Sequence, residues 1–82
     1  MARILVADDH DGTQGILRVL LQQRSGWEVC GEASTGEEVL KKRVELKPDV
    51  IVRDWVMSGM DSVELTRQIC AQSPDTAIVR YA

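Results

Sequence analysis

The chain has 82 residues, a length that suits one domain spanning residues 1–82. Hydrophobic residues make up 44% and charged residues 28%, a balance that is ordinary for a soluble globular protein and excludes a disordered chain. The formal net charge is −3 and no apolar run approaches the length of a membrane span, so we expect neither direct binding to nucleic acid nor a membrane association.

The first third of the chain alternates between strand and helix patterns. Residues 3–7 are an apolar run that stops at acidic residues, which predicts a short buried strand. Residues 13–24 place leucine and isoleucine at i,i+4 spacing, so they predict a helix with one apolar face that ends at Ser25-Gly26. Residues 27–32 alternate between apolar and polar and predict a second strand, nearer an edge of the sheet.

A second helix and a third strand follow. Either Ser34 or Thr35 is suited to cap the helix, and the acidic residues after them favour its positive end. Lys47-Pro48 closes this helix, because the residue before a proline is disfavoured in the helical conformation. Residues 49–54 predict the third strand, which ends unusually in the charge pair Arg53-Asp54.

The last elements complete a regular α/β order. A capping-box pattern at Asp61 starts a third helix that runs to about Gln72, and residues 76–82 predict a fourth strand. The resulting βαβαβαβ order predicts a parallel sheet with right-handed crossovers. We expect a flavodoxin-like, doubly wound sheet in the order 2-1-3-4, which makes the first and third strands neighbours.

Three carboxylates are predicted to meet at one edge of this sheet. Asp8 and Asp9 follow the first strand and Asp54 ends the third, and ligands in such sheets bind outside the carboxyl ends of the strands. Clustered carboxylates repel one another unless a cation neutralises them, and Mg²⁺ prefers such oxygen ligands. An aspartate beside this ion can act as a nucleophile toward a phosphoryl group.

Several segments together resemble one protein family. The stretches ILVADDH, GWEVCGEASTGEE, LKPDVIV and ELTRQI and the M-x-G-M turn at Met57 are similar to the receiver domain of bacterial two-component response regulators. The resemblance is closest to the subfamily with a C-terminal helix-turn-helix output domain. It implies phosphoryl transfer from a histidine kinase to Asp54. It also implies Mg²⁺ held directly by Asp9, partly through water by Asp8, and by Asp54 and the Val56 carbonyl.

Each of these acidic residues also has a plainer structural interpretation. Asp9 or Asp11 could cap the first helix, and Asp54 could simply end a strand. His10, which is the only histidine, is more typical of a solvent-facing loop residue than of an accessory group at a phosphoryl site. The site hypothesis therefore depends on the acids occurring together and in this order.

The sequence departs from the family pattern at several positions. Ser58 replaces a proline of the loop after the acceptor, and Ser62 replaces a glycine. Ala82 stands where the family has a serine or threonine whose hydroxyl binds the phosphoryl group. The fifth strand, its lysine and the last two helices have no counterpart. We therefore expect a truncated receiver-like domain whose switching is impaired.

Arg53 and Arg80 occupy strand positions where the family has aliphatic residues. Because side chains alternate along a strand, Arg53 is expected on the opposite face from Asp54, where the absent fifth helix would leave the sheet bare. Neither arginine is expected to be buried alone. Trp55 and Tyr81 either cover that exposed surface or are ordinary packing aromatics. The bare face predicts a homodimer, with a soluble monomer as the alternative.

The cysteines and the chemistry-bearing residues limit the function further. Cys30 and Cys70 belong to no CxxC or Cys/His cluster, which argues against a zinc site and favours reduced, partly buried thiols in a cytoplasmic protein. No Ser/His/Asp set, glycine-rich phosphate loop or Cys/His pair is present, so we expect no enzyme with its own substrate. Two hypotheses remain: a signalling module that binds Mg²⁺, and a scaffold or interaction protein, natural or engineered, that has lost the switch.

Overall fold

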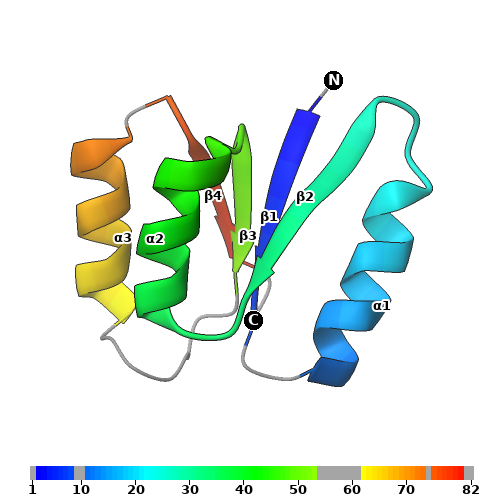
Figure 1. Cartoon of the computed structure of the whole chain (residues 1–82), viewed down its shortest axis with the longest axis horizontal. Coiled ribbons are helices and arrows are strands. Elements are labelled where there is room, and N and C mark those ends of the chain that lie inside the picture. The colour runs from blue at the N-terminus through cyan, green and yellow to red at the C-terminus, as the bar shows by residue number, and fades with distance from the viewer. Residues whose placement is uncertain (1, 9–10, 54–61, 74, 81–82) are drawn as a thin grey trace.

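A computed structural model of the chain describes residues 2–8, 11–53, 62–73 and 75–80. Strands and helices alternate along these residues as the sequence predicts (Figure 1). The strands are β1 (Ala2–Ala7), β2 (Trp27–Ala33), β3 (Val50–Arg53) and β4 (Ala77–Arg80), and the helices are α1 (Asp11–Gln22), α2 (Gly36–Leu46) and α3 (Ser62–Gln72). The predicted βαβαβαβ order is confirmed.

The strands form one parallel sheet in the order β2-β1-β3-β4. This is the flavodoxin-like order expected from the sequence, and it places the first and third strands side by side. The register pairs Ala7 at the end of β1 with Ala33 of β2 on one side and with Arg53 of β3 on the other. The carboxyl ends of the three strands therefore reach one edge of the sheet together.

The first helix differs from the sequence prediction by two residues, and the structure decides the cap of the second. Helix α1 begins at Asp11 and ends at Gln22, two residues earlier than expected at each end. The chain then turns through Gly26, whose φ of 84° suits a residue without a Cβ. Helix α2 is capped by Thr35, not by Ser34, because the Thr35 hydroxyl accepts a hydrogen bond from the Glu38 N–H at 3.1 Å.

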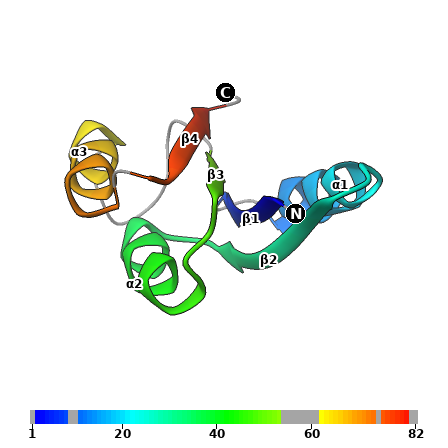
Figure 2. The ribbon, with the colours of Figure 1, turned by 90° about the horizontal axis from the view of Figure 1, so that it is seen from above.

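The helices divide between the two faces of the sheet (Figure 2). Helices α2 and α3 cover one face, where the larger core cluster lies; it comprises Leu5, Ala7, Ala33, Val39, Ile51, Leu65 and Ile69. Helix α1 covers the β1–β2 part of the other face, where Leu17 and Leu21 pack against a smaller cluster of Ile4, Val6 and Val29. Alternation along β1 sends Leu5 and Val6 to opposite clusters, which joins the two halves of the core.

The predicted position of Arg53 is wrong. Its side chain is only 1% exposed and lies on the α3 side of the sheet, where Nη1 donates a hydrogen bond to Thr66 Oγ1 at 2.7 Å. Ile51 occupies the same side two residues earlier, whereas Val50 and Val52 face the α1 side. Arg53 is thus buried with a partner under α3 and does not mark the bare face.

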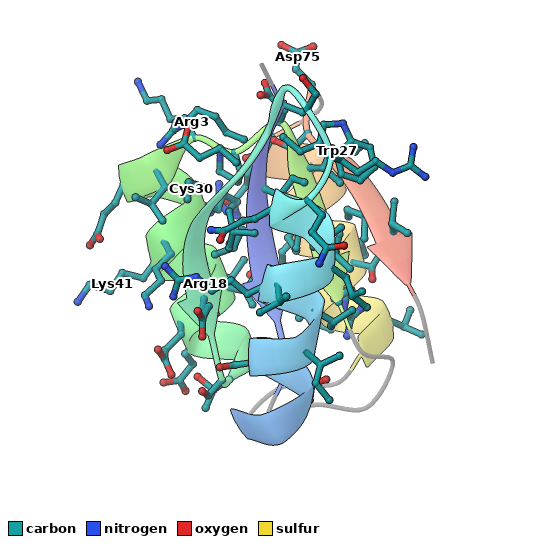
Figure 3. All side chains as sticks on the ribbon, turned by 90° about the vertical axis from the view of Figure 1, so that its right-hand side faces the viewer. Arg3, Arg18, Trp27, Cys30, Lys41 and Asp75 are labelled. Atoms are coloured by element: carbon teal, nitrogen blue, oxygen red, sulfur yellow. The ribbon has the colours of Figure 1, made fainter. Side chains whose placement is uncertain are left out.

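The face beyond α1 is uncovered in the described part of the chain, as predicted. An apolar groove of about 340 Å³ lies there, and its lining residues are Ala2, Ile4, Leu21, Trp27, Val50, Val52 and Val79. Trp27 lies toward the end of the sheet remote from the start of α1 (Figure 3) and stacks under the Arg24 guanidinium at 5.4 Å. Strand β4 is an edge of the sheet, also as predicted.

Other predictions have mixed outcomes. Both cysteines are free thiols, but only Cys30 is partly buried, and Cys70 is exposed on α3. No helix among the described residues is long and apolar enough to cross a membrane. The predictions for Trp55, Ser58 and the loop after the acceptor, and for Tyr81 and Ala82, fall outside the described residues. The main chain of Arg80 pairs with that of Arg53.

Candidate functional site

The described part of the predicted acidic site is the carboxyl end of β1. Asp8 directly follows this strand and is only 1% exposed. Its N–H donates a hydrogen bond to the Ala33 carbonyl at 3.0 Å, which continues the β1–β2 pairing by one more step. Because β3 ends at Arg53 beside Ala7, Asp8 lies at the edge where the sequence predicted the carboxylates to gather.

The remaining predicted site residues lie outside the described residues. These are Asp9 and Asp54 with their carboxylates, Val56 with its carbonyl, and the neighbouring His10. Within the described ranges, no group of three or more His, Cys, Asp or Glu side chains could hold a metal ion. Asp8 fits Mg²⁺ by its chemistry, because a carboxylate at the edge of a parallel sheet supplies the hard oxygen that this ion prefers.

Sequence reasoning missed one residue of this region, Gln14 on α1. Glutamine is usually exposed, yet Gln14 is only 5% exposed. Its Nε2 donates to the main-chain carbonyl of Asp8, to the Ala33 carbonyl at 3.0 Å and to Ser34 Oγ at a longer 3.4 Å. The only available signal was the single polar residue on the buried side of an otherwise apolar helix face.

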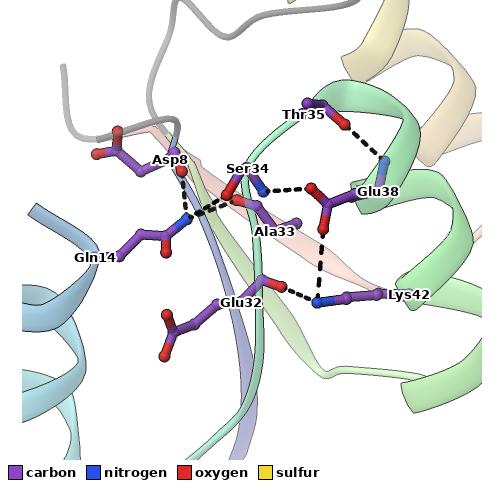
Figure 4. A network of polar contacts seen from close by, with 8 residues as sticks. All are labelled: Asp8, Gln14, Glu32, Ala33, Ser34, Thr35, Glu38 and Lys42. Carbon is purple, nitrogen blue, oxygen red and sulfur yellow. Dashed lines mark hydrogen bonds and ion pairs between the residues drawn. The ribbon is translucent and has the colours of Figure 1, made fainter. Parts of the chain in front are cut away.

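The hydrogen bonds continue from Ser34 into the start of α2 (Figure 4). The Ser34 N–H donates to Glu38 Oε1 at 3.4 Å, while Glu38 in turn donates its N–H to the capping Thr35. Lys42 Nζ lies 3.8 Å from Glu38 Oε2 and also donates to the Glu32 carbonyl. The end of β2 and the first turn of α2 are therefore held as one unit next to Asp8.

Comparison with known proteins places this chain in one family. The profile described as response regulator receiver domain matches residues 4–81. The transcriptional regulatory protein LiaR of Bacillus subtilis is 46% identical over 79 residues, which cover 96% of this chain and 37% of LiaR. The response regulator GacA of Pseudomonas viridiflava is 43% identical over 79 residues, again covering 96% of this chain and 37% of the relative.

Solved structures agree with the sequence relatives. A two-component response regulator of the LuxR family from an Aurantimonas species superposes with a TM-score of 0.91 at 31% identity, over 98% of this chain and 57% of that one. The response regulator domain of Thermotoga maritima CheB gives a TM-score of 0.90 at 31% identity, over 98% of this chain and 59% of that one.

The chain therefore spans about 37% of the length of the curated relatives that it matches. The match to the family profile extends through all the described strands and helices, apart from the first two residues of β1. The similarity to the receiver domain that the motifs indicate is confirmed, and the parallel sheet has the order that the family implies. The chain belongs to the response regulator receiver domain family.

Proposed function

We propose that the chain is a Mg²⁺-dependent phosphoacceptor, in which Asp54 receives a phosphoryl group from a histidine kinase. The observation that carries this proposal is the position of Asp8, buried at the carboxyl end of β1 in the strand register that places the end of β3 alongside. Membership of the receiver family supports the role of Asp54, which follows β3 directly in the sequence.

The residues that would hold Mg²⁺ are Asp8, Asp9, Asp54 and the Val56 carbonyl. When bound, the ion neutralises the charge of the carboxylates and of the incoming phosphoryl group. A carboxylate oxygen of Asp54 attacks phosphorus, the bond to the donor nitrogen breaks, and the donor imidazole leaves. Asp8 is suited to a fixed role in this reaction, since its surroundings are packed and its main chain is hydrogen-bonded.

Phosphorylation can be tested with acetyl phosphate and intact-mass measurement, with and without Mg²⁺. We expect a mass increase of one phosphoryl group that requires Mg²⁺ and disappears in Asp54→Asn. Asp49→Asn is a matched control, because Asp49 is an exposed aspartate whose Oδ2 accepts from the Arg3 N–H at 2.8 Å, before the start of β3. A chain that never gains this mass, or that gains it equally in Asp54→Asn, contradicts the proposal.

Metal binding can be tested separately by tryptophan fluorescence. Trp27 lies at the start of β2, away from the carboxyl ends of the strands, so Trp27→Phe leaves Trp55, next to Asp54 in the sequence, as the only tryptophan. We expect Mg²⁺ to change the fluorescence of this variant and Asp8→Asn to weaken the response. A flat titration into the millimolar range would count against a metal site.

We also propose that switching is impaired, on the basis of Ala82. This residue offers no hydroxyl at the position where the family has a serine or threonine. The NMR spectra of the backbone amides should then be nearly the same in the phosphorylated and unphosphorylated chains, except for residues close to Asp54. Introducing Ala82→Thr should widen the difference between the two spectra, and an equally wide difference in the unmodified sequence would contradict the idea.

A second candidate function is a scaffold that self-associates, and the apolar groove beside α1 favours it. The groove is continuous with the open edge of β4, because Val79 lines it and is 50% exposed. A second copy of the chain is a suitable occupant, since the β4 edge and the apolar face of one copy can pack against the same surfaces of the other across a two-fold axis. Light scattering should then show a dimer that Val79→Lys dissociates, whereas Val44→Lys on α2 should not. A monomer at micromolar concentration would exclude this candidate.

A further inference from the structure

Gln14 makes contacts that reach beyond its own helix. We propose that it is a positioning residue, which holds the main chain at Asp8 and thereby orients the carboxylate for Mg²⁺. The inference rests on the proposed metal site at the carboxyl end of β1. Among the described residues, its side-chain amide donates to the main-chain carbonyls of Asp8 and Ala33 and to the Ser34 hydroxyl.

The chemistry of these contacts requires a hydrogen-bond donor. A carbonyl oxygen can only accept hydrogen bonds, so two carbonyls that converge on one side chain need a group with two N–H donors. The Nε2 of Gln14 provides both, and the reverse orientation would bring its Oε1 against two other oxygens. Because the side chain is buried, water cannot replace these bonds cheaply, and a carbonyl left without a donor costs free energy.

The hydrogen bonds hold Asp8 from both sides of its Cα. Its N–H donates to the Ala33 carbonyl at 3.0 Å, and its own carbonyl accepts from Gln14. The Ala33 carbonyl receives both the Asp8 N–H and the Gln14 amide, so the ends of β1 and β2 are connected through a single oxygen. In Figure 4 the Asp8 carboxylate points away from Gln14, while the main chain behind it carries the contacts.

A ligand carboxylate that is oriented in advance binds metal more tightly, because less conformational freedom is lost on binding. Removing the residues that orient metal ligands typically weakens metal affinity by 10- to 100-fold. We therefore expect the amide of Gln14 to matter for Mg²⁺ affinity as well as for stability. A purely structural role would lower the stability of the fold and leave the affinity of the folded chain unchanged.

The test compares Gln14→Met with Gln22→Met. Methionine keeps the length of the side chain and removes the donors, and Gln22 is an exposed residue at the end of the same helix. Circular dichroism confirms that each variant is folded at the temperature used, and the Trp27→Phe background reports Mg²⁺ binding. We expect Gln14→Met to weaken binding by at least roughly 10-fold and Gln22→Met to leave it unchanged. Ser34→Ala should also have little effect, because it removes only the longest of the three contacts.

A second measurement uses the metal-free parent chain and so does not depend on the variants folding. The side-chain amide protons of Gln14 should exchange with solvent far more slowly than those of Gln22. Equal exchange of the two side chains would mean that Gln14 is not held by these hydrogen bonds, and it would overturn the inference. A folded Gln14→Met that binds Mg²⁺ like the parent would overturn it as well.

The outcomes separate this inference from the proposed function. If the parent chain binds no Mg²⁺, the metal site is wrong and the positioning role fails with it. This holds even if slow exchange shows that Gln14 makes its hydrogen bonds. If the parent binds Mg²⁺ and the folded Gln14→Met binds equally well, the metal site stands and only the positioning role is overturned.

Discussion

Replacing Thr66 by valine tests whether the buried Arg53 depends on its hydroxyl partner. Valine has nearly the shape of threonine but cannot accept the hydrogen bond that Arg53 Nη1 donates at 2.7 Å. Hydrogen bonds to charged groups contribute about 1.5–3 kcal/mol, and Arg53 is only 1% exposed, so water cannot readily replace the lost acceptor. We expect Thr66→Val to lower the free energy of unfolding by about 2 kcal/mol.

The assay is urea unfolding followed by circular dichroism, with thermal unfolding as a second measurement. For a domain of this size, 1 kcal/mol shifts the melting temperature by about 4–8 °C, so the expected decrease is roughly 8–16 °C. Thr66→Ser is the matched control, because it keeps the acceptor and removes only a methyl group. The double variant Arg53→Met/Thr66→Val should recover part of the loss, since an apolar pair of similar shape leaves no buried charge.

Two results would refute this reasoning. Thr66→Val within about 0.5 kcal/mol of the parent would mean that the contact adds little to the stability of the fold. A double variant that is less stable than Thr66→Val alone would mean that Arg53 stabilises the sheet through its other interactions more than through this hydroxyl.

Three further predictions concern a helix cap, an ion pair and the two thiols. Thr35→Ala should lower the free energy of unfolding by ~1 kcal/mol in urea, because the first turn of α2 loses its cap, and an unchanged urea midpoint would argue against that role. The hydrogen bonds from Arg67 hold the pKa of Glu64 at about 2, below its ordinary 4.5. The contribution of this pair to the stability of the fold is therefore fully present above pH 4.5 and is lost as the pH falls through 2. A carbon-13 titration of Glu64 should show the low midpoint, and Arg67→Met should raise that midpoint. Iodoacetamide should label the exposed Cys70 before Cys30, whose pKa is raised by burial; mass mapping that finds Cys30 labelled first would contradict this.

Much of the fold could be predicted from the sequence, because its signals are local. Apolar runs of strand length alternate with helix-period segments, and that alternation leads to a parallel sheet. Helix ends were harder: Ser34 and Thr35 are both good caps by composition, and the choice depends on which hydroxyl reaches the Glu38 N–H. The position of Asp8 at the sheet edge also followed from the order of elements, whereas Asp9, Asp54 and Val56 remain predictions.

Two features needed the tertiary structure. In β3, Val50, Ile51 and Val52 are all apolar, so the pattern shows that Arg53 and its neighbours alternate but not which face each one takes. Packing decides this, because Ile51 fits the cluster under α2 and α3, and Arg53 follows it to the same side and reaches Thr66. The role of Gln14 was likewise hidden, because its partners come from the ends of two strands that only folding brings together. The sequence by itself thus determined the order of the elements and the edge where Asp8 lies, since these depend on local periodicity and chain topology. Only the tertiary structure decided the face of Arg53 and the contacts of Gln14, since these depend on which distant surfaces meet.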